Sequence, residues 1–120
     1  MSSKTKIEIK QLADFIAENL DNKKGIDIEV LDISGKTQLA DYFVIVSGRT
    51  GVQAKALADE VEVKVKEEYD LDPRFSEGYD TREWILLDYL DVIVHIFTEE
   101  TRDYYQLERL WLNSGSSSTD

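Results

Sequence analysis

Two short apolar runs in the second half of the chain constrain the fold more than any other feature. They cover residues 84–87 and 92–97, and a break of four residues with two aspartates separates them. Each run is too short for a typical helix and is rich in β-branched and aromatic residues, so the pattern predicts a β-hairpin. The length and the aspartates of the break suit a hairpin loop. We expect the second strand to be buried on both faces because it is apolar throughout.

Periodic patterns elsewhere predict helices and strands in an α/β order. Thr5 and Glu8 have capping-box spacing, and the amphipathic helix that follows ends near Gly25, a suitable left-handed cap. After the hairpin, a further helical segment starts at Thr98 and Glu99. The other predicted elements are a half-buried strand over 26–30, a buried strand over 41–46, a long helix over about 52–69 and a short strand over 74–77.

This order predicts a single α/β domain over residues 1–112. Its sheet is mixed and has four or five strands, and helices cover at least one face. Residues 113–120 are rich in serine, contain no apolar side chain and are expected to form a disordered polar tail.

Charge and composition limit the classes of partner. The net charge is −11, from 14 basic and 25 acidic residues. Phosphate backbones repel such a surface, so little direct nucleic-acid binding is expected, whereas a basic protein partner is favoured. The simplest alternative is that the charge only keeps the protein soluble. The chain contains no run of about 18 apolar residues, so no membrane span is predicted. The polar start does not resemble a signal peptide, cysteine is absent, and we expect a cytoplasmic protein.

Two aromatic groups are candidate contact sites. Trp84 and Tyr89 lie at the first strand of the hairpin, beside Asp88, and would make good protein-binding anchors if exposed. From the pattern alone, both are more simply explained as core aromatics. Further on, the apolar residues at i, i+3 and i+7 share one face of the predicted last helix, which either packs on the sheet or contacts a partner or a dimer mate. These residues are Tyr104, Leu107 and Trp111.

The rival class is an enzyme or a nucleotide-binding protein. Asp88 and Asp91 could hold a divalent metal, although acids three positions apart around a hairpin turn are common loop residues. His95 is the only histidine and is better explained as a core residue than as a metal ligand. The Gly-Lys-Thr sequence at residues 35–37 lacks the earlier glycine that a phosphate-binding loop needs. We therefore predict no catalytic residues, no cofactor and no metal.

Seven segments, taken in order, resemble the ribosomal silencing factor family, also called the Iojap family. Together they cover about residues 8–112, and their order and spacing make the resemblance specific. The segments are Lys24-Gly25-x-Asp27-Ile28-x-Val30-Leu31-Asp32, Leu39-Ala40-Asp41-Tyr42-Phe43-Val44-Ile45, Gly48 with Gln53-x-x-Ala56-Leu57-Ala58-Asp59-Glu60, Glu77-Gly78-Tyr79, Trp84-Ile85-Leu86-Leu87-Asp88-Tyr89, Asp91-Val92-Ile93-Val94-His95-Ile96-Phe97 and Tyr105-x-Leu107-Glu108-x-Leu110-Trp111.

The resemblance implies a nucleotidyltransferase-like fold without known catalytic activity. It also implies binding to a basic protein of the large ribosomal subunit at the subunit-joining face. Bound there, the protein would block the small subunit and repress translation under nutrient shortage, and it would be a homodimer when free. The resemblance favours Trp84, Leu87, Asp88 and Tyr89 as interface residues, with Tyr104, Leu107 and Trp111 as second-tier contacts. Leu90 departs from the small or polar residue that is common in the family, which leaves the turn type open.

Overall fold

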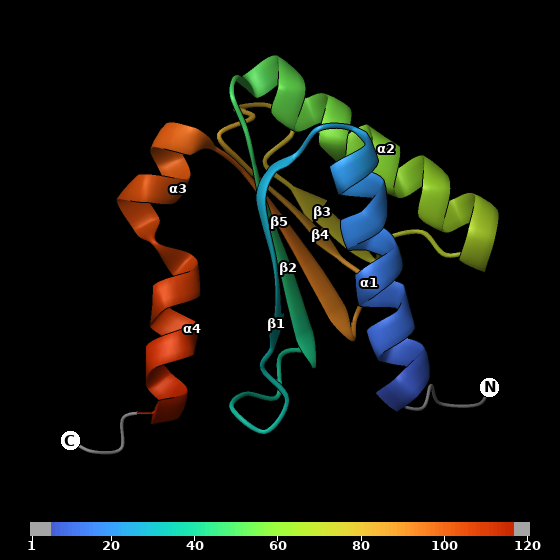
Figure 1. The fold of residues 1–120 in the computed structure, drawn as a ribbon. Helices are drawn as coiled ribbons and strands as arrows, with labels where there is room; N and C mark the ends of the chain where they lie inside the picture. The colour runs from blue at the N-terminus through green and yellow to red at the C-terminus, as the bar shows by residue number, and fades with distance from the viewer. Residues whose placement is uncertain (1–5, 117–120) are drawn as a thin grey trace.

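A five-stranded sheet with helices on both faces forms the centre of the computed structural model, which describes residues 6–116 (Figure 1). The predicted α/β class with a mixed sheet is confirmed. In chain order the elements are α1 Lys6–Asn22, β1 Ile26–Asp32, β2 Tyr42–Gly48, α2 Gly51–Tyr69, β3 Phe75–Glu77, β4 Trp84–Asp88, β5 Val92–Thr98, α3 Glu99–Tyr105 and α4 Leu107–Ser116.

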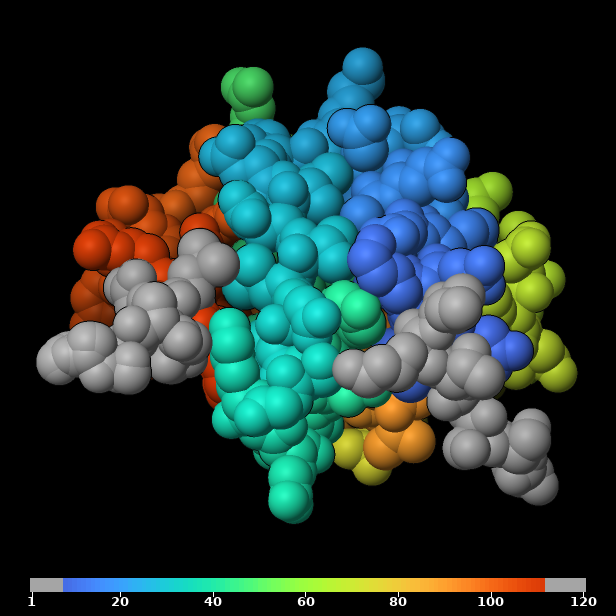
Figure 2. Space-filling view, turned by 60° about the horizontal axis from the view of Figure 1, so that its bottom comes forward, coloured from blue at the N-terminus to red at the C-terminus, as the bar shows by residue number. Residues whose placement is uncertain are grey.

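The strand order is β1-β2-β5-β4-β3, and only the central pair is parallel. β2 and β5 run side by side, with Tyr42 opposite Val92 and Gly48 opposite Thr98. The remaining neighbours are antiparallel, so the sheet is mixed. β1 is an edge strand, and Figure 2 shows it crossing the middle of one side of the molecule, between α1 and the C-terminal helices.

The helices divide between the two faces of the sheet (Figure 1). α1 and α2 cover one face, where Val44, Leu87 and Val94 contribute to the larger apolar core. α3 and α4 lie on the opposite face, where Phe43, Ile45 and Phe97 form a second apolar cluster. Both faces of β2 and β5 are buried, which explains why their sequences are almost continuously apolar.

The predicted hairpin is confirmed as β4 and β5. Its loop is closed by a hydrogen bond from the Tyr89 amide to the Val92 carbonyl, 2.9 Å long. An Asp88 carboxylate oxygen accepts from the Leu90 amide at 2.7 Å. Leu90 has φ of 78°, a left-handed conformation that small or polar residues adopt more easily, so the departure from the family pattern falls at a strained position.

The C-terminal segment differs from the prediction in two ways. A left-handed residue, Gln106 with φ of 50°, divides it into α3 and α4. Helical spacing therefore does not continue from Tyr104 to Leu107 and Trp111, and the three side chains do not form one stripe. In addition, α4 runs to Ser116, so residues 113–116 are helical rather than part of a disordered tail. Residues 117–120, and Thr5 of the predicted capping box, lie outside the described part.

Candidate functional site

The candidate site is the part of the sheet that α3 and α4 leave open. α3 packs on β5 and β2, and α4 packs on β1, whereas β4 and β3 lie beyond β5 in the sheet. Trp84, Leu86 and Asp88 alternate along β4 and point to this side. Phe75 of β3 pairs with Asp88, so it shares their face, and it is 50% exposed. We call Phe75, Trp84, Leu86 and the neighbouring Tyr105 the Trp84 surface.

Trp84 is held in place by aromatic contacts and one hydrogen bond. Its ring lies 4.7 Å from Phe97 and 4.9 Å from Tyr105, measured between ring centroids. The indole Nε1 donates to Nδ1 of His95 at 3.1 Å. The indole is thus partly exposed yet fixed, as a preorganised binding anchor should be.

His95 is buried and supports Trp84 from within the sheet. Burial lowers the pKa of His95 to about 4, so the imidazole is neutral at neutral pH. Since Nδ1 accepts the indole hydrogen bond, the ring proton resides on Nε2, which is buried and has no partner within the described residues. The prediction of a core histidine agrees with this position.

Asp88 is not a free carboxylate. Its side chain is 14% exposed, and its two oxygens accept from Nε and Nη2 of Arg74 at 3.1 and 3.3 Å. A basic group from a partner would have to share or displace this guanidinium. Contact between Asp88 and a partner therefore stays a prediction, and Asp88 is better placed at the margin of the Trp84 surface than at its centre.

Leu87 and Tyr89 lie on the opposite face from Trp84. Leu87 is fully buried and Tyr89 is 6% exposed, and both belong to the core beneath α1 and α2. The Tyr89 hydroxyl is buried and has no hydrogen-bond partner among the residues that the structure describes, and burial raises its pKa above the usual range for tyrosine. Direct contact with a partner would require the core to open, so we assign both residues to the core.

The second predicted group of contact residues is split between two helices, with Tyr104 on α3 and Leu107 and Trp111 on α4. Tyr104 is 79% exposed on α3 and contacts only the ring of Tyr105 among the aromatic pairs of the described residues. Leu107 and Trp111 of α4 pack instead on the second apolar cluster, with the Trp111 ring 5.4 Å from Phe43. Tyr104 is thus available for contacts, whereas Leu107 and Trp111 mainly attach α4 to the sheet.

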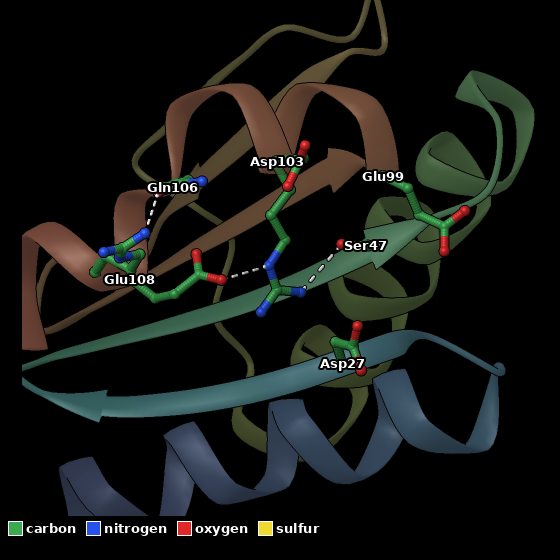
Figure 3. A pocket seen from close by; sticks show the side chains of 8 residues that line it. Asp27, Ser47, Glu99, Asp103, Gln106 and Glu108 are labelled. Carbon is green, nitrogen blue, oxygen red and sulfur yellow. Dashed lines mark hydrogen bonds and ion pairs between the residues drawn. The ribbon is translucent and has the colours of Figure 1, made fainter.

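A buried arginine that the sequence analysis did not single out, Arg102, joins the C-terminal helices to the sheet. Figure 3 labels two of its partners, Ser47 and Glu108. Arg102 donates to Glu108 at 3.0 Å, to the Ser47 hydroxyl at 3.0 Å and to the Ile26 carbonyl at 3.3 Å. It therefore connects α3, α4, β1 and β2. No local motif marks an arginine for such a role, because its partners are distant in the sequence.

Metal chemistry finds no support in the described residues. Among them, no group of three or more histidine or acidic side chains could hold a metal ion. The residue pair that the rival hypothesis needs, Asp88 and Asp91, includes one carboxylate that Arg74 already binds. None of the described helices is long and apolar enough to cross a membrane.

Fold and surface together define a small α/β protein with a fixed, partly exposed tryptophan on the open part of a mixed sheet. The model of the family described as "ribosomal silencing factor during starvation" matches residues 6–120. The chain is 41% identical to the ribosomal silencing factor RsfS of Chromobacterium violaceum, over 88% of this chain and 85% of that protein. A crystal structure of a protein from the same organism superposes with a TM-score of 0.83 at 41% identity, covering 87% of this chain and 86% of the other.

A more distant relative is the mouse protein named mitochondrial assembly of ribosomal large subunit protein 1. It is 31% identical over 82% of this chain and 44% of its own length. The chain belongs to the ribosomal silencing factor family. Membership supports a regulatory, ribosome-associated silencing role and a ribosome-related partner.

Proposed function

We propose that this protein represses translation by binding a basic protein of the large ribosomal subunit at its subunit-joining face. Bound there, it blocks association with the small subunit, mainly under nutrient limitation. Two names support this proposal: the family description refers to starvation, and the mouse relative is named for the large ribosomal subunit. We further propose that the protein acts in the cytoplasm and is a homodimer when free.

The Trp84 surface is the observation that supports the contact. Trp84 and Leu86 are partly exposed, and Phe75 and Tyr105 are each about half exposed. Exposed aromatic groups with few rotatable bonds are efficient anchors, because little side-chain entropy is lost on binding. Tyr104 extends the same kind of surface along α3. Leu107, Trp111, Leu87 and Tyr89 would support the surface from the core.

Silencing by this route requires no chemistry. A protein of 13.8 kDa that occupies a joining face prevents subunit association by its volume alone. The net charge of −11 speeds encounter with a basic protein and disfavours adhesion to ribosomal RNA. The alternative of a metal-dependent nucleotide enzyme has no specific observation in its favour.

Co-sedimentation tests the proposal directly. The protein is mixed with isolated large subunits, isolated small subunits and joined ribosomes, and each mixture is separated on a sucrose gradient. We expect it to migrate with free large subunits, to be scarce on joined ribosomes, and to reduce joining when added before the small subunit. Equal binding to small subunits, or none to large subunits, would contradict the proposal.

A further inference from the structure

A hollow adjoins the Trp84 surface and is formed by the end of β3, the connection to β4 and two β4 side chains. It is lined by Glu77, Gly78, Asp80, Thr81, Trp84 and Leu86. The chain turns back over β4 at Gly78, which has φ of 93°. A Cβ atom at this position would collide with the Trp84 carbonyl oxygen, so glycine is required for the turn to lie this close to β4.

The chemistry of the hollow is apolar on one side and acidic on the other. Trp84 and Leu86 supply partly exposed apolar area. Glu77 pairs with Leu86 across the strands and therefore points to the same face. Asp80 is exposed, and one of its carboxylate oxygens accepts from the Thr81 amide at 2.9 Å.

Neither acid at the rim is neutralised within the described part of the chain. Its eight ion pairs include neither Glu77 nor Asp80. The nearest cations in sequence are engaged elsewhere: Arg74, three residues before Glu77, binds Asp88. Arg82, two residues after Asp80, lines a different hollow together with Arg49 and Gly51. The apolar wall and the two carboxylates thus match a side chain that has both a flat or aliphatic part and a positive charge.

We propose that this hollow receives a single arginine side chain of the basic ribosomal partner. The guanidinium stacks on the Trp84 indole while its donors reach Glu77 and Asp80, a combination that suits arginine better than lysine. His95 supports this arrangement because its hydrogen bond keeps the indole in one orientation. The proposal rests on the proposed function and adds the specific recognition of one basic residue.

A short peptide tests the hollow without the ribosome. N-acetyl-Gly-Arg-Gly-amide and the matching Gly-Gln-Gly peptide are titrated into the labelled protein, and the backbone and indole N–H resonances are followed by NMR. We expect the arginine peptide alone to shift the Trp84 indole and Gly78 amide resonances, saturating at millimolar concentration. The Trp111 indole packs against Phe43 and does not line the hollow, so its resonance serves as an internal reference.

Two double variants carry the same change of charge at different places. Glu77→Gln with Asp80→Asn removes the acidic rim, whereas Glu67→Gln with Glu68→Gln removes two exposed acids of α2 on the opposite face. We expect the rim variant to lose the peptide-induced shifts and to bind large subunits about tenfold more weakly. The α2 variant should behave as wild type in both measurements, and thermal melting should confirm that both variants fold.

The outcomes separate this inference from the proposed function. If the wild type binds large subunits but the glutamine peptide shifts the same resonances equally, or the rim variant binds as the α2 variant does, the arginine hollow is refuted and the proposed function stands. If the wild type does not bind large subunits at all, the proposed function itself fails.

Discussion

The hydrogen bond from Trp84 to His95 connects a side chain at the surface with one at the centre of the sheet. His95 is 5% exposed and lies between Phe43, at 4.5 Å, and the Trp84 ring, at 5.9 Å, measured between ring centroids. Only the neutral imidazole can accept the indole hydrogen bond at Nδ1. The stability of the fold and the orientation of Trp84 therefore both depend on His95 being neutral.

This dependence predicts a loss of stability in mild acid. The folded pKa of His95, about 4, is below the unfolded value near 6.5, so the unfolded chain takes up the proton first. The contribution is fully present above pH 6.5 and is lost as the pH falls toward 4, and it amounts to at most about 3 kcal/mol. Urea unfolding of wild type and His95→Gln at pH 7, 5.5 and 4.5 measures this contribution of His95 to the free energy of unfolding.

Carboxylates titrate in both proteins, so the difference between the two curves isolates the histidine. The stability of wild type should fall more steeply between pH 6.5 and 4 than that of His95→Gln. Parallel curves would show that His95 does not carry this pH dependence.

Trp84 and Tyr89 should respond in opposite ways to truncation, because they lie on opposite faces of the sheet. Trp84→Ala is expected to weaken large-subunit binding by roughly thirtyfold or more, corresponding to about 2 kcal/mol. Tyr89→Ala instead should cost about 3–5 kcal/mol of unfolding free energy. Tyr89→Phe is a sharper control: it removes a buried hydroxyl that has no partner in the described part of the chain, so it should leave binding intact and raise stability by about 1 kcal/mol. Loss of binding in Tyr89→Phe would return Tyr89 to the interface.

At the level of elements, two glycines with similar positive φ angles should tolerate alanine very differently. Gly35, with φ of 84°, has open space where a Cβ would lie, whereas Gly78 has the backbone of Trp84 and Ile85 there. Gly35→Ala should cost only the left-handed backbone penalty, about 1–2 kcal/mol. Gly78→Ala should cost clearly more and should also weaken large-subunit binding, since β4 carries Trp84. Chemical unfolding and co-sedimentation test both, and equal losses would contradict the close approach at Gly78.

Elements marked by a pattern in their own sequence were readily predicted, whereas features that depend on distant contacts were not. Runs of apolar residues identified β2, β4 and β5. β2 and β5 are buried at almost every consecutive side chain, whereas buried and partly exposed side chains alternate along β4. The break at Gln106 was missed because the left-handed conformation there is adopted by a residue that does not favour it. Side chains alternate along β4, so Trp84 and Leu87 point to different faces, but only the packing of α3 and α4 decides which face stays open.

For the molecule as a whole, the acidic charge should make ribosome binding sensitive to salt. Raising monovalent salt from 50 to 300 mM at constant magnesium should weaken co-sedimentation of the wild type several-fold, because exposed charges are screened beyond about 6 Å at the higher concentration. The aromatic contacts are unaffected by screening, so some binding should persist. Binding that strengthens with salt would indicate that the apolar contacts dominate and that the charge opposes association.

The central position of β5 also determines when the chain can fold during its synthesis. β2 is made early, yet its parallel partner ends at Thr98, and α2 and β4 both pack on that partner. Until β5 has left the ribosome, β2 has only β1 beside it and the two long helices have only part of their docking surface. Strands this distant in sequence pair slowly, because the entropy cost of closing a long loop comes before the stabilising contacts form. A nascent chain that stalls before residue 98 therefore exposes apolar strand faces and cannot complete the sheet.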